Sequence, residues 1–154
     1  MEFSNLTTTA LLEACREDGQ STGNPEPVRD GINRPVGNDP HCWVSHPGDW
    51  ISYHLPTETS VNTITLVLDS ALDQNIVLSY HQQDDQRTSP PDRMPKTFRL
   101  EGLSNKEWIP LAYIANNYQR QVRLSVQRSL AAIRYVLDET WGDNTSQLFA
   151  FYLD

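Results

Sequence analysis

The sequence has few cysteines and no long hydrophobic run. Cys15 and Cys42 are too few for a disulfide framework and do not form a Cys-x-x-Cys unit, so they assign no redox compartment and leave open whether one bridge joins them. No stretch approaches the roughly 20 apolar residues of a membrane-spanning helix, and the N-terminus lacks the basic and then apolar layout of a signal peptide. We therefore expect a soluble chain, in a compartment that the sequence does not specify.

Basic charge is also scarce. The 154 residues include 12 lysines and arginines against 20 aspartates and glutamates, which gives a formal net charge of −8 at pH 7. The basic residues are scattered along the chain, whereas nucleic-acid backbones and anionic membrane surfaces reward clustered lysine and arginine. This balance argues against a nucleic acid or a membrane surface as the partner.

The motifs of nucleotide binding and nucleophilic catalysis are missing. The seven glycines are dispersed, and none forms a G-x-G-x-x-G or G-x-x-x-x-G-K loop. The serines lack a G-x-S-x-G elbow, and no cysteine and histidine form a nucleophile arrangement. An enzyme needs a converged nucleophile, base and oxyanion set, so we expect no catalytic residue and no bound cofactor of that kind in this chain.

The length is that of one domain with a short leading segment. Residues 1–20 are expected to form an N-terminal helix and linker, because threonines offer an N-cap and Gly19 can end a helix over residues 8–18. The opening "MEF" also matches what a common cloning site encodes, so it does not enter the fold prediction. Residues 21–154 are then the folded domain.

Short segments rich in β-branched and aromatic residues dominate the chain from Trp50 onward. Before them, residues 19–42 are dense in Gly, Pro, Asn and Asp and predict a long loop or linker, and the polar residues 81–95 predict an exposed loop. No helical pattern separates the segments, so the sequence predicts an all-β fold, an eight-stranded antiparallel jelly-roll β-sandwich. The eight candidate strands are residues 50–55, 61–68, 75–81, 96–101, 107–113, 121–127, 132–137 and 147–153.

The adjacent carboxylates Asp138 and Glu139 are the first candidates for catalysis. Neighbouring residues on a strand point to opposite faces, which places such a pair poorly for acid and base work on one substrate atom. We therefore interpret Asp138 and Glu139 as loop residues between the last two strands. Trp141 and Gly142 follow as a tight turn whose indole covers the end of the core.

Two segments contain candidate metal ligands. His41, Cys42 and His46 lie within six residues, but structural zinc usually takes two separated pairs of ligands and no second pair follows. Cys42 is better interpreted as a small buried hydrophobic residue. In "VRDGINRP", Asp30 and Asn33 offer oxygen ligands for Ca²⁺, while the alternative is an Asx-type turn closed by Asp30 with Gly31 at positive φ.

The order of several motifs resembles the discoidin or galactose-binding-like family over about residues 20–154. The motifs are "DG" at 30–31, "WVS" at 43–45, "WISYHL", "VNTITLVL", Trp108, and "IRYVL" followed by a closing aromatic strand. This resemblance implies an eight-stranded jelly roll. "DGINRP", "MPKTFRLEG", "NNYQRQVRLSV" and "IRYVLDETWG" further resemble the C-terminal domain of bacterial FAD-dependent oxidoreductases, in which FAD would belong to an upstream domain.

The resemblance also implies where a ligand would lie, with two departures. His46 falls where such modules often place a sugar-contacting histidine, but Asp69 stands where galactose-binding members carry an arginine, and a carboxylate only accepts hydrogen bonds. Ala150 stands where calcium-binding members place a glutamate, which weakens the Ca²⁺ prediction at Asp30 and Asn33. The candidate ligand-binding residues are Trp43, His46, Asp69, Asn117, Arg120 and Trp141.

Two functions follow from this resemblance. The chain is a non-catalytic module that docks to the catalytic domain of its own parent protein, or it is a lectin-like module that binds a glycan with loops at one end of the sandwich. The missing arginine favours docking, and Trp141 fits its turn so closely that it is expected to cover the core. A glycan site should expose an aromatic ring beside fixed polar groups, whereas a docking site should expose an apolar patch.

Overall fold

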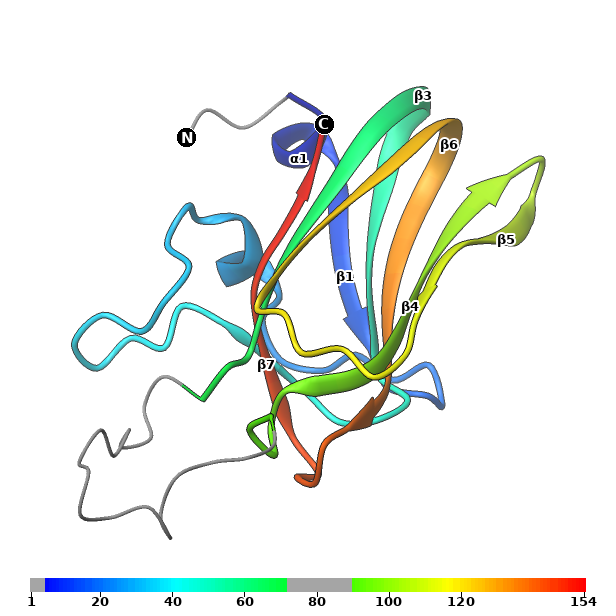
Figure 1. Cartoon of the computed structure of the whole chain (residues 1–154). Coiled ribbons are helices and arrows are strands. Elements are labelled where there is room, and N and C mark those ends of the chain that lie inside the picture. Colours follow the sequence, from blue (N-terminus) through cyan, green and yellow to red (C-terminus); the bar gives the residue numbers. More distant parts are fainter. Residues whose placement is uncertain (1–4, 72–89) are drawn as a thin grey trace, which may run out of the picture.

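A computed structural model describes residues 5–71 and 90–154 of the chain (Figure 1). The candidate strand at residues 75–81 lies outside these residues. The elements in chain order are α1 (Asn5–Thr9), β1 (Leu11–Cys15), the 3₁₀ helix η1 (Glu26–Arg29), β2 (Trp43–Ser45), β3 (Trp50–Leu68), β4 (Pro95–Ser104), β5 (Glu107–Ile114), β6 (Gln121–Thr140) and β7 (Ser146–Leu153).

Two long antiparallel strands, β3 and β6, pass through both layers of a β-sandwich. Their pairing shifts register between His54 and Thr59 and again between Val61 and Thr63, and bulges of this kind bend a strand. Before the bend β3 also pairs with β1, and after it β3 pairs with β7. One layer is therefore β1-β3-β6-β4-β5 and the other is β2-β7-β3-β6, joined through the bent strands.

This arrangement confirms the prediction of an all-β antiparallel sandwich. The candidate strands 50–55 and 61–68 are two halves of β3, and 121–127 and 132–137 are two halves of β6. The strands at 96–101, 107–113 and 147–153 correspond to β4, β5 and β7. The short strand β2 was not among the candidates.

The core lies between the two layers and is built from alternate residues of each strand. Ile51 and Tyr53 of β3 and Phe98 of β4 are fully buried in one layer, and they face Leu66 and Phe151 of the other. The rings of Tyr53 and Phe151 meet edge to face at 4.8 Å, and the Tyr53 hydroxyl donates a 2.6 Å hydrogen bond to the Phe151 carbonyl. Each such buried side chain contributes roughly 1.5–3 kcal/mol.

The predicted helix over residues 8–18 is wrong. The helix α1 ends at Thr9, and the strand β1 follows, paired with the first half of β3 from Leu11 to Cys15. Leu11 is 61 % exposed while Leu12 and Ala14 are buried, which is the alternation of a strand with one face on the core. Pairing with β3 therefore outweighs the local helix propensity of alanine and leucine.

Asp138 and Glu139 are strand residues, so the loop assigned to them is also wrong. The strand β6 continues to Thr140, and the turn begins at Trp141. On β4, Arg99 hydrogen-bonds to Asp138, and Lys96 lies 3.3 Å from Glu139. These ion pairs hold the last residues of β6 against β4.

Most connections gather at one end of the sandwich, away from the bends of β3 and β6 and from the C-terminus (Figure 1). We call this the loop end. It comprises residues 46–49, 68–71, 90–94, 115–120 and 141–145. The loop of residues 31–36 reaches the same region through contacts with Arg120.

Candidate functional site

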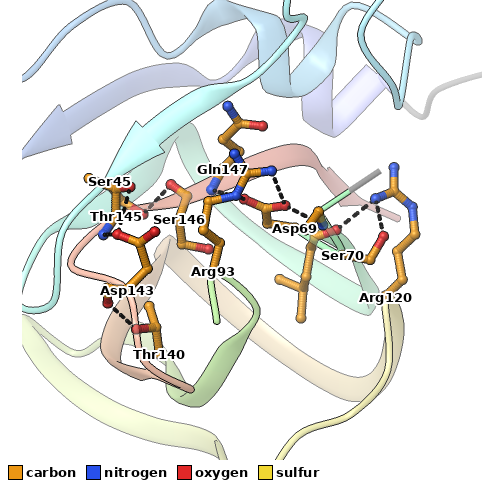
Figure 2. Close-up of polar contacts among 12 residues, drawn as sticks. Ser45, Asp69, Ser70, Arg93, Arg120, Thr140, Asp143, Thr145, Ser146 and Gln147 are labelled. Carbon is orange, nitrogen blue, oxygen red and sulfur yellow. Dashed lines mark hydrogen bonds and ion pairs between the residues drawn. The ribbon is translucent and has the colours of Figure 1, made fainter. Parts of the chain in front are cut away.

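Asp69 is the centre of a buried polar network at the loop end (Figure 2). The side chain is 1 % exposed, and its carboxylate accepts hydrogen bonds from the backbone N–H groups of Ala71 (2.7 Å) and Gln147 (3.1 Å). The Arg93 guanidinium lies 3.2 Å from the same carboxylate, which compensates its buried charge. Asp69 thus joins three segments and is an anchor of the loop end.

The resemblance implies an arginine at position 69, but the structure has a carboxylate there, and an arginine is its ion-pair partner. The carboxylate comes from Asp69 and the guanidinium from Arg93, which lies in the segment before β4. No local pattern in the sequence indicates Arg93, because the two residues are 24 positions apart and lie in different loops.

Arg120 lines a hollow beside this network. Its guanidinium donates to the carbonyls of Leu68 (3.1 Å) and Asn33 and to the Ser70 hydroxyl (3.0 Å), and it lies 4.9 Å from the centre of the Phe149 ring. Burial lowers the pKa of Arg120 and the Asp69 carboxylate opposes that shift, so the side chain stays cationic. These contacts fix the orientation of the guanidinium.

The hollow above Arg120 has a volume of about 570 Å³, within the range of small-molecule sites. Two of its lining side chains, Ile32 and Val36, are exposed hydrophobic residues. The hollow therefore combines a fixed hydrogen-bond donor with apolar walls. Its lining residues are Gly31, Ile32, Asn33, Arg34, Val36 and Arg120.

Asn117 fixes the loop that precedes Arg120. Its side chain is 5 % exposed, donates to the carbonyls of Pro95 and Gln119 (both 3.1 Å) and accepts from the N–H of Gln119 (3.1 Å). Between these anchored positions, Tyr118 is 74 % exposed. A large aromatic ring held outward on a fixed loop is a surface suited to stacking. Tyr118 was not among the predicted site residues, although it is an aromatic residue inside the polar segment "NNYQRQ".

The three other candidate residues lie in different environments. Trp43, a candidate ligand-binding residue, is 2 % exposed in β2 and its indole N–H donates to the Thr22 hydroxyl (3.3 Å), so its buried ring presents no surface to a ligand. The His46 side chain is 56 % exposed and lies 3.5 Å from Asp49. Trp141 is half-buried with the Lys96 ammonium 5.2 Å from its ring centre, and its interpretation as a cover for the core stays a prediction.

The predicted calcium ligands have other contacts. One Asp30 oxygen accepts from the N–H of Ile32 (2.8 Å) with Gly31 at φ 85°, which is the Asx-type turn of the alternative prediction, and the other oxygen lies 2.7 Å from His41. The Asn33 side-chain oxygen accepts from the Tyr152 hydroxyl (2.8 Å). An ion would have to displace these groups, and calcium binding stays a prediction.

The described residues hold no group of three or more His, Cys, Asp and Glu side chains that could hold a metal ion. Cys42 is buried as predicted, and burial, with a smaller effect of Asp69, raises the pKa of its thiol to about 11. This agrees with the interpretation of Cys42 as a small buried hydrophobic residue. Cys15 and Cys42 are both free thiols.

Comparison with solved structures identifies proteins with a similar fold. No protein-family model and no curated protein matches the chain. Solved structures do: chitosan-binding module 1 of a chitosanase/glucanase from Paenibacillus sp. IK-5 (TM-score 0.62, 13 % identity, 95 % of both chains) and the family 32 module of C. perfringens NanJ in complex with galactose (TM-score 0.65, 12 % identity, 99 % and 98 %). The family 32 module of AlyQ in complex with 4,5-unsaturated mannuronic acid is also similar (TM-score 0.64, 12 % identity, 100 % and 98 %).

At these identities the likeness establishes the fold alone. The chain has the galactose-binding-like β-sandwich of family 32 carbohydrate-binding modules, as the order of its motifs implied. These neighbours are binding modules, so the attachment of this domain to a FAD-dependent oxidoreductase stays a prediction. Within residues 5–71 and 90–154, no helix is long and apolar enough to cross a membrane.

Proposed function

We propose that this chain is a non-catalytic carbohydrate-binding module that holds a sugar at the loop end. The observation that carries the proposal is Tyr118, which is 74 % exposed in the loop between the anchored Asn117 and Arg120, one of the residues that line the hollow. A pyranose ring presents an apolar C–H face to an aromatic ring and hydroxyl groups to its surroundings. Tyr118 supplies the stacking surface, and the hollow supplies polar contacts.

Arg120 is suited to fix the sugar's orientation. The described residues engage three of its N–H groups, and a guanidinium has five. Because those three bonds fix the guanidinium before a ligand arrives, binding loses little side-chain entropy. His46, exposed elsewhere at the loop end, is a second candidate contact.

The charge of the chain narrows the class of sugar. The neighbours include a chitosan-binding module, a galactose complex and a complex with an unsaturated uronic acid. A net charge of −8 repels a polyuronate and does not repel a neutral or amino-sugar glycan. We therefore propose a neutral or amino-sugar polysaccharide as the partner.

A docking role beside a parent enzyme is compatible with this function, since a glycan module commonly serves a catalytic domain. The flavin-dependent parent remains a separate proposal that rests on the motif resemblance. Reading the source gene upstream of Ser4 tests it. A G-x-G-x-x-G fingerprint after a strand pattern would support a flavoenzyme, and a stop codon directly upstream would overturn it.

The glycan proposal is tested with an oligosaccharide array of neutral, amino-sugar and uronate chains, with and without chelator. The Tyr118→Ala variant should lose roughly 1–3 kcal/mol of binding free energy, as expected when an aromatic stacking platform is removed. Tyr113→Ala is the matched control, because Tyr113 is 68 % exposed on the strand β5 and lies outside the loop that carries Tyr118. Absence of binding to every glycan, in both conditions, overturns the proposal.

A further inference from the structure

A second groove lies on the outer face of the layer formed by β1, β3, β6, β4 and β5. Its volume is about 300 Å³. Phe98, Leu100 and Tyr135 point into the core. Because successive side chains on a strand alternate between faces, the adjacent residues Arg99, Arg134 and Val136 point outward. The lining residues are Glu17, Gly48, Trp50, Arg99, Arg134, Val136 and Asp138.

Three of the lining residues, Arg99, Arg134 and Asp138, belong to a ladder of ion pairs across β4 and β6 that also includes Glu101. Arg134 donates to Glu101 at 3.0 Å, and Arg99 donates to Glu101 at 2.9 Å and also to Asp138. Burial alone would raise the pKa of Glu101, but the hydrogen bonds from Arg134 and Arg99 outweigh it and lower that pKa. The groove therefore has charged groups that are already paired and held in place.

Two indole rings flank the same ladder. The Arg134 guanidinium lies 4.2 Å from the centre of the Trp108 ring and 5.8 Å from that of Trp50. Both contacts are within cation–π range, so Arg134 also fixes the positions of the two rings. Trp50 lines the groove and keeps part of its ring exposed.

The chemistry of the groove selects its occupant. Two arginines, Arg99 and Arg134, stand against the carboxylates of Glu17, Glu101 and Asp138, so the groove offers no net positive charge to a phosphate, a sulfate or a uronate. Its ionised lining is equally unsuited to an apolar peptide. A neutral sugar fits, because its hydroxyls both donate and accept hydrogen bonds and its C–H face can stack on Trp50.

We propose that this groove is a second binding site, which takes one neutral hexose residue of a glycan. Its volume is at the lower limit for a small-molecule site, which matches a single sugar ring. None of its lining residues lines the hollow above Arg120, so the two sites are separate. A module with two sites can bind two residues or two chains of one polysaccharide, and linked weak sites raise overall avidity.

The test is a titration of the ¹⁵N-labelled chain, followed by amide chemical shifts, with galactose, glucose and mannose and with the uronate of each sugar. Neutral sugars should shift the amides of Trp50, Arg134 and Val136, and uronates should not. The shifts should persist in Tyr118→Ala, which alters only the loop end. Trp50→Ala should lower the affinity obtained from these shifts at least tenfold. Trp50→Phe, which keeps a ring, should retain it. Thermal unfolding checks that each variant is folded.

The outcomes separate this inference from the loop-end proposal. Shifts confined to the loop end, or no shift with any of the three neutral hexoses, overturn the groove as a sugar site and leave its ion pairs as a staple between β4 and β6. Groove shifts that follow uronates as strongly as neutral sugars overturn the assigned ligand class. Groove shifts without loop-end shifts support this inference while the loop-end proposal fails.

Discussion

The indole N–H of Trp141 donates a 2.7 Å hydrogen bond to the backbone carbonyl of Asn117. This bond joins the turn between β6 and β7 to the loop between β5 and β6. The N–H of Asn117 in turn donates to the Lys96 carbonyl at 3.0 Å, so the loop is tied to β4 as well. Tyr118 is exposed on a loop whose base is tied both to the β6–β7 turn and to β4, which suits it to the binding role proposed for it.

Replacing Asn117 with alanine should loosen that loop. The change removes three side-chain hydrogen bonds and leaves the buried Pro95 carbonyl without its donor. We expect a loss of about 1–3 kcal/mol in the free energy of unfolding and weaker glycan binding, because Tyr118 is no longer held outward. Urea unfolding and a binding titration measure the two effects. Gln119→Ala keeps the backbone contacts and should change neither, and equal effects of both variants would contradict this account.

The Glu101 carboxylate should make stability depend on pH. Its pKa is lowered in the folded state by Arg134 and Arg99 despite burial, so the unfolded chain binds protons more readily. The stabilisation is therefore fully present above the unfolded value of about 4.3 and is lost as the pH falls through the lower folded pKa. At pH 7, Glu101→Gln should lower the free energy of unfolding by about 1–3 kcal/mol, less than for a fully buried pair because the side chain is 16 % exposed.

Urea unfolding between pH 7 and pH 3 measures this dependence. The difference between the original chain and Glu101→Gln should shrink toward the acid end. Glu107→Gln serves as the control, since Glu107 is exposed at the β4–β5 hairpin and should stay within about 0.5 kcal/mol at every pH. A constant difference across the range would show that Glu101 does not titrate as proposed.

The fold was predictable because its signals are local. Short β-rich segments and turn residues identify the sandwich. They also predict two separate strands on either side of Pro56 and the polar residues after it, whereas β3 bends there without ending. The segment 11–15 alternates as a strand does, yet its alanine and leucine favour a helix, and only the contact with β3 decides between them.

The site was less predictable because burial depends on partners distant in sequence. Trp43 is buried since β2 pairs with β7, more than 100 residues away, and a tryptophan in a polar loop segment gives no local sign of this. Asn117 and Arg120 were identified as polar residues between strands, but their roles as anchor and lining residue follow from Pro95, Leu68 and Asn33. Tyr118, like Trp43, lies in a polar segment, and only the contacts of the folded chain decide that Tyr118 is exposed and Trp43 is buried.

The two thiols should differ in reactivity and should not be bridged. Cys42 is 8 % exposed with a pKa of about 11, so on the order of one molecule in a thousand is thiolate at pH 8. Cys15 is half-buried, and burial and Glu13 raise its pKa as well. A thiol reagent should modify Cys15 first, reach Cys42 only on unfolding, and count two thiols in denaturant. A count of zero thiols in denaturant without reductant would show a disulfide. The slower reaction should be absent from Cys42→Ser, which assigns that reaction to Cys42.

Gly102 is packed closely against two leucine side chains. A Cβ atom there would lie 2.7 Å and 3.0 Å from the two Cδ atoms of Leu130, which is fully buried, and 3.1 Å from a Cδ atom of Leu111. Gly102→Ala forces these side chains out of their positions in a dense core, so we expect a loss of about 1–3 kcal/mol in the free energy of unfolding. Leu130→Ala removes the clashing atoms, and the cost of the double variant should therefore be smaller than the sum of the single costs. Additive costs in urea unfolding would show that the Cβ meets no resistance from Leu130.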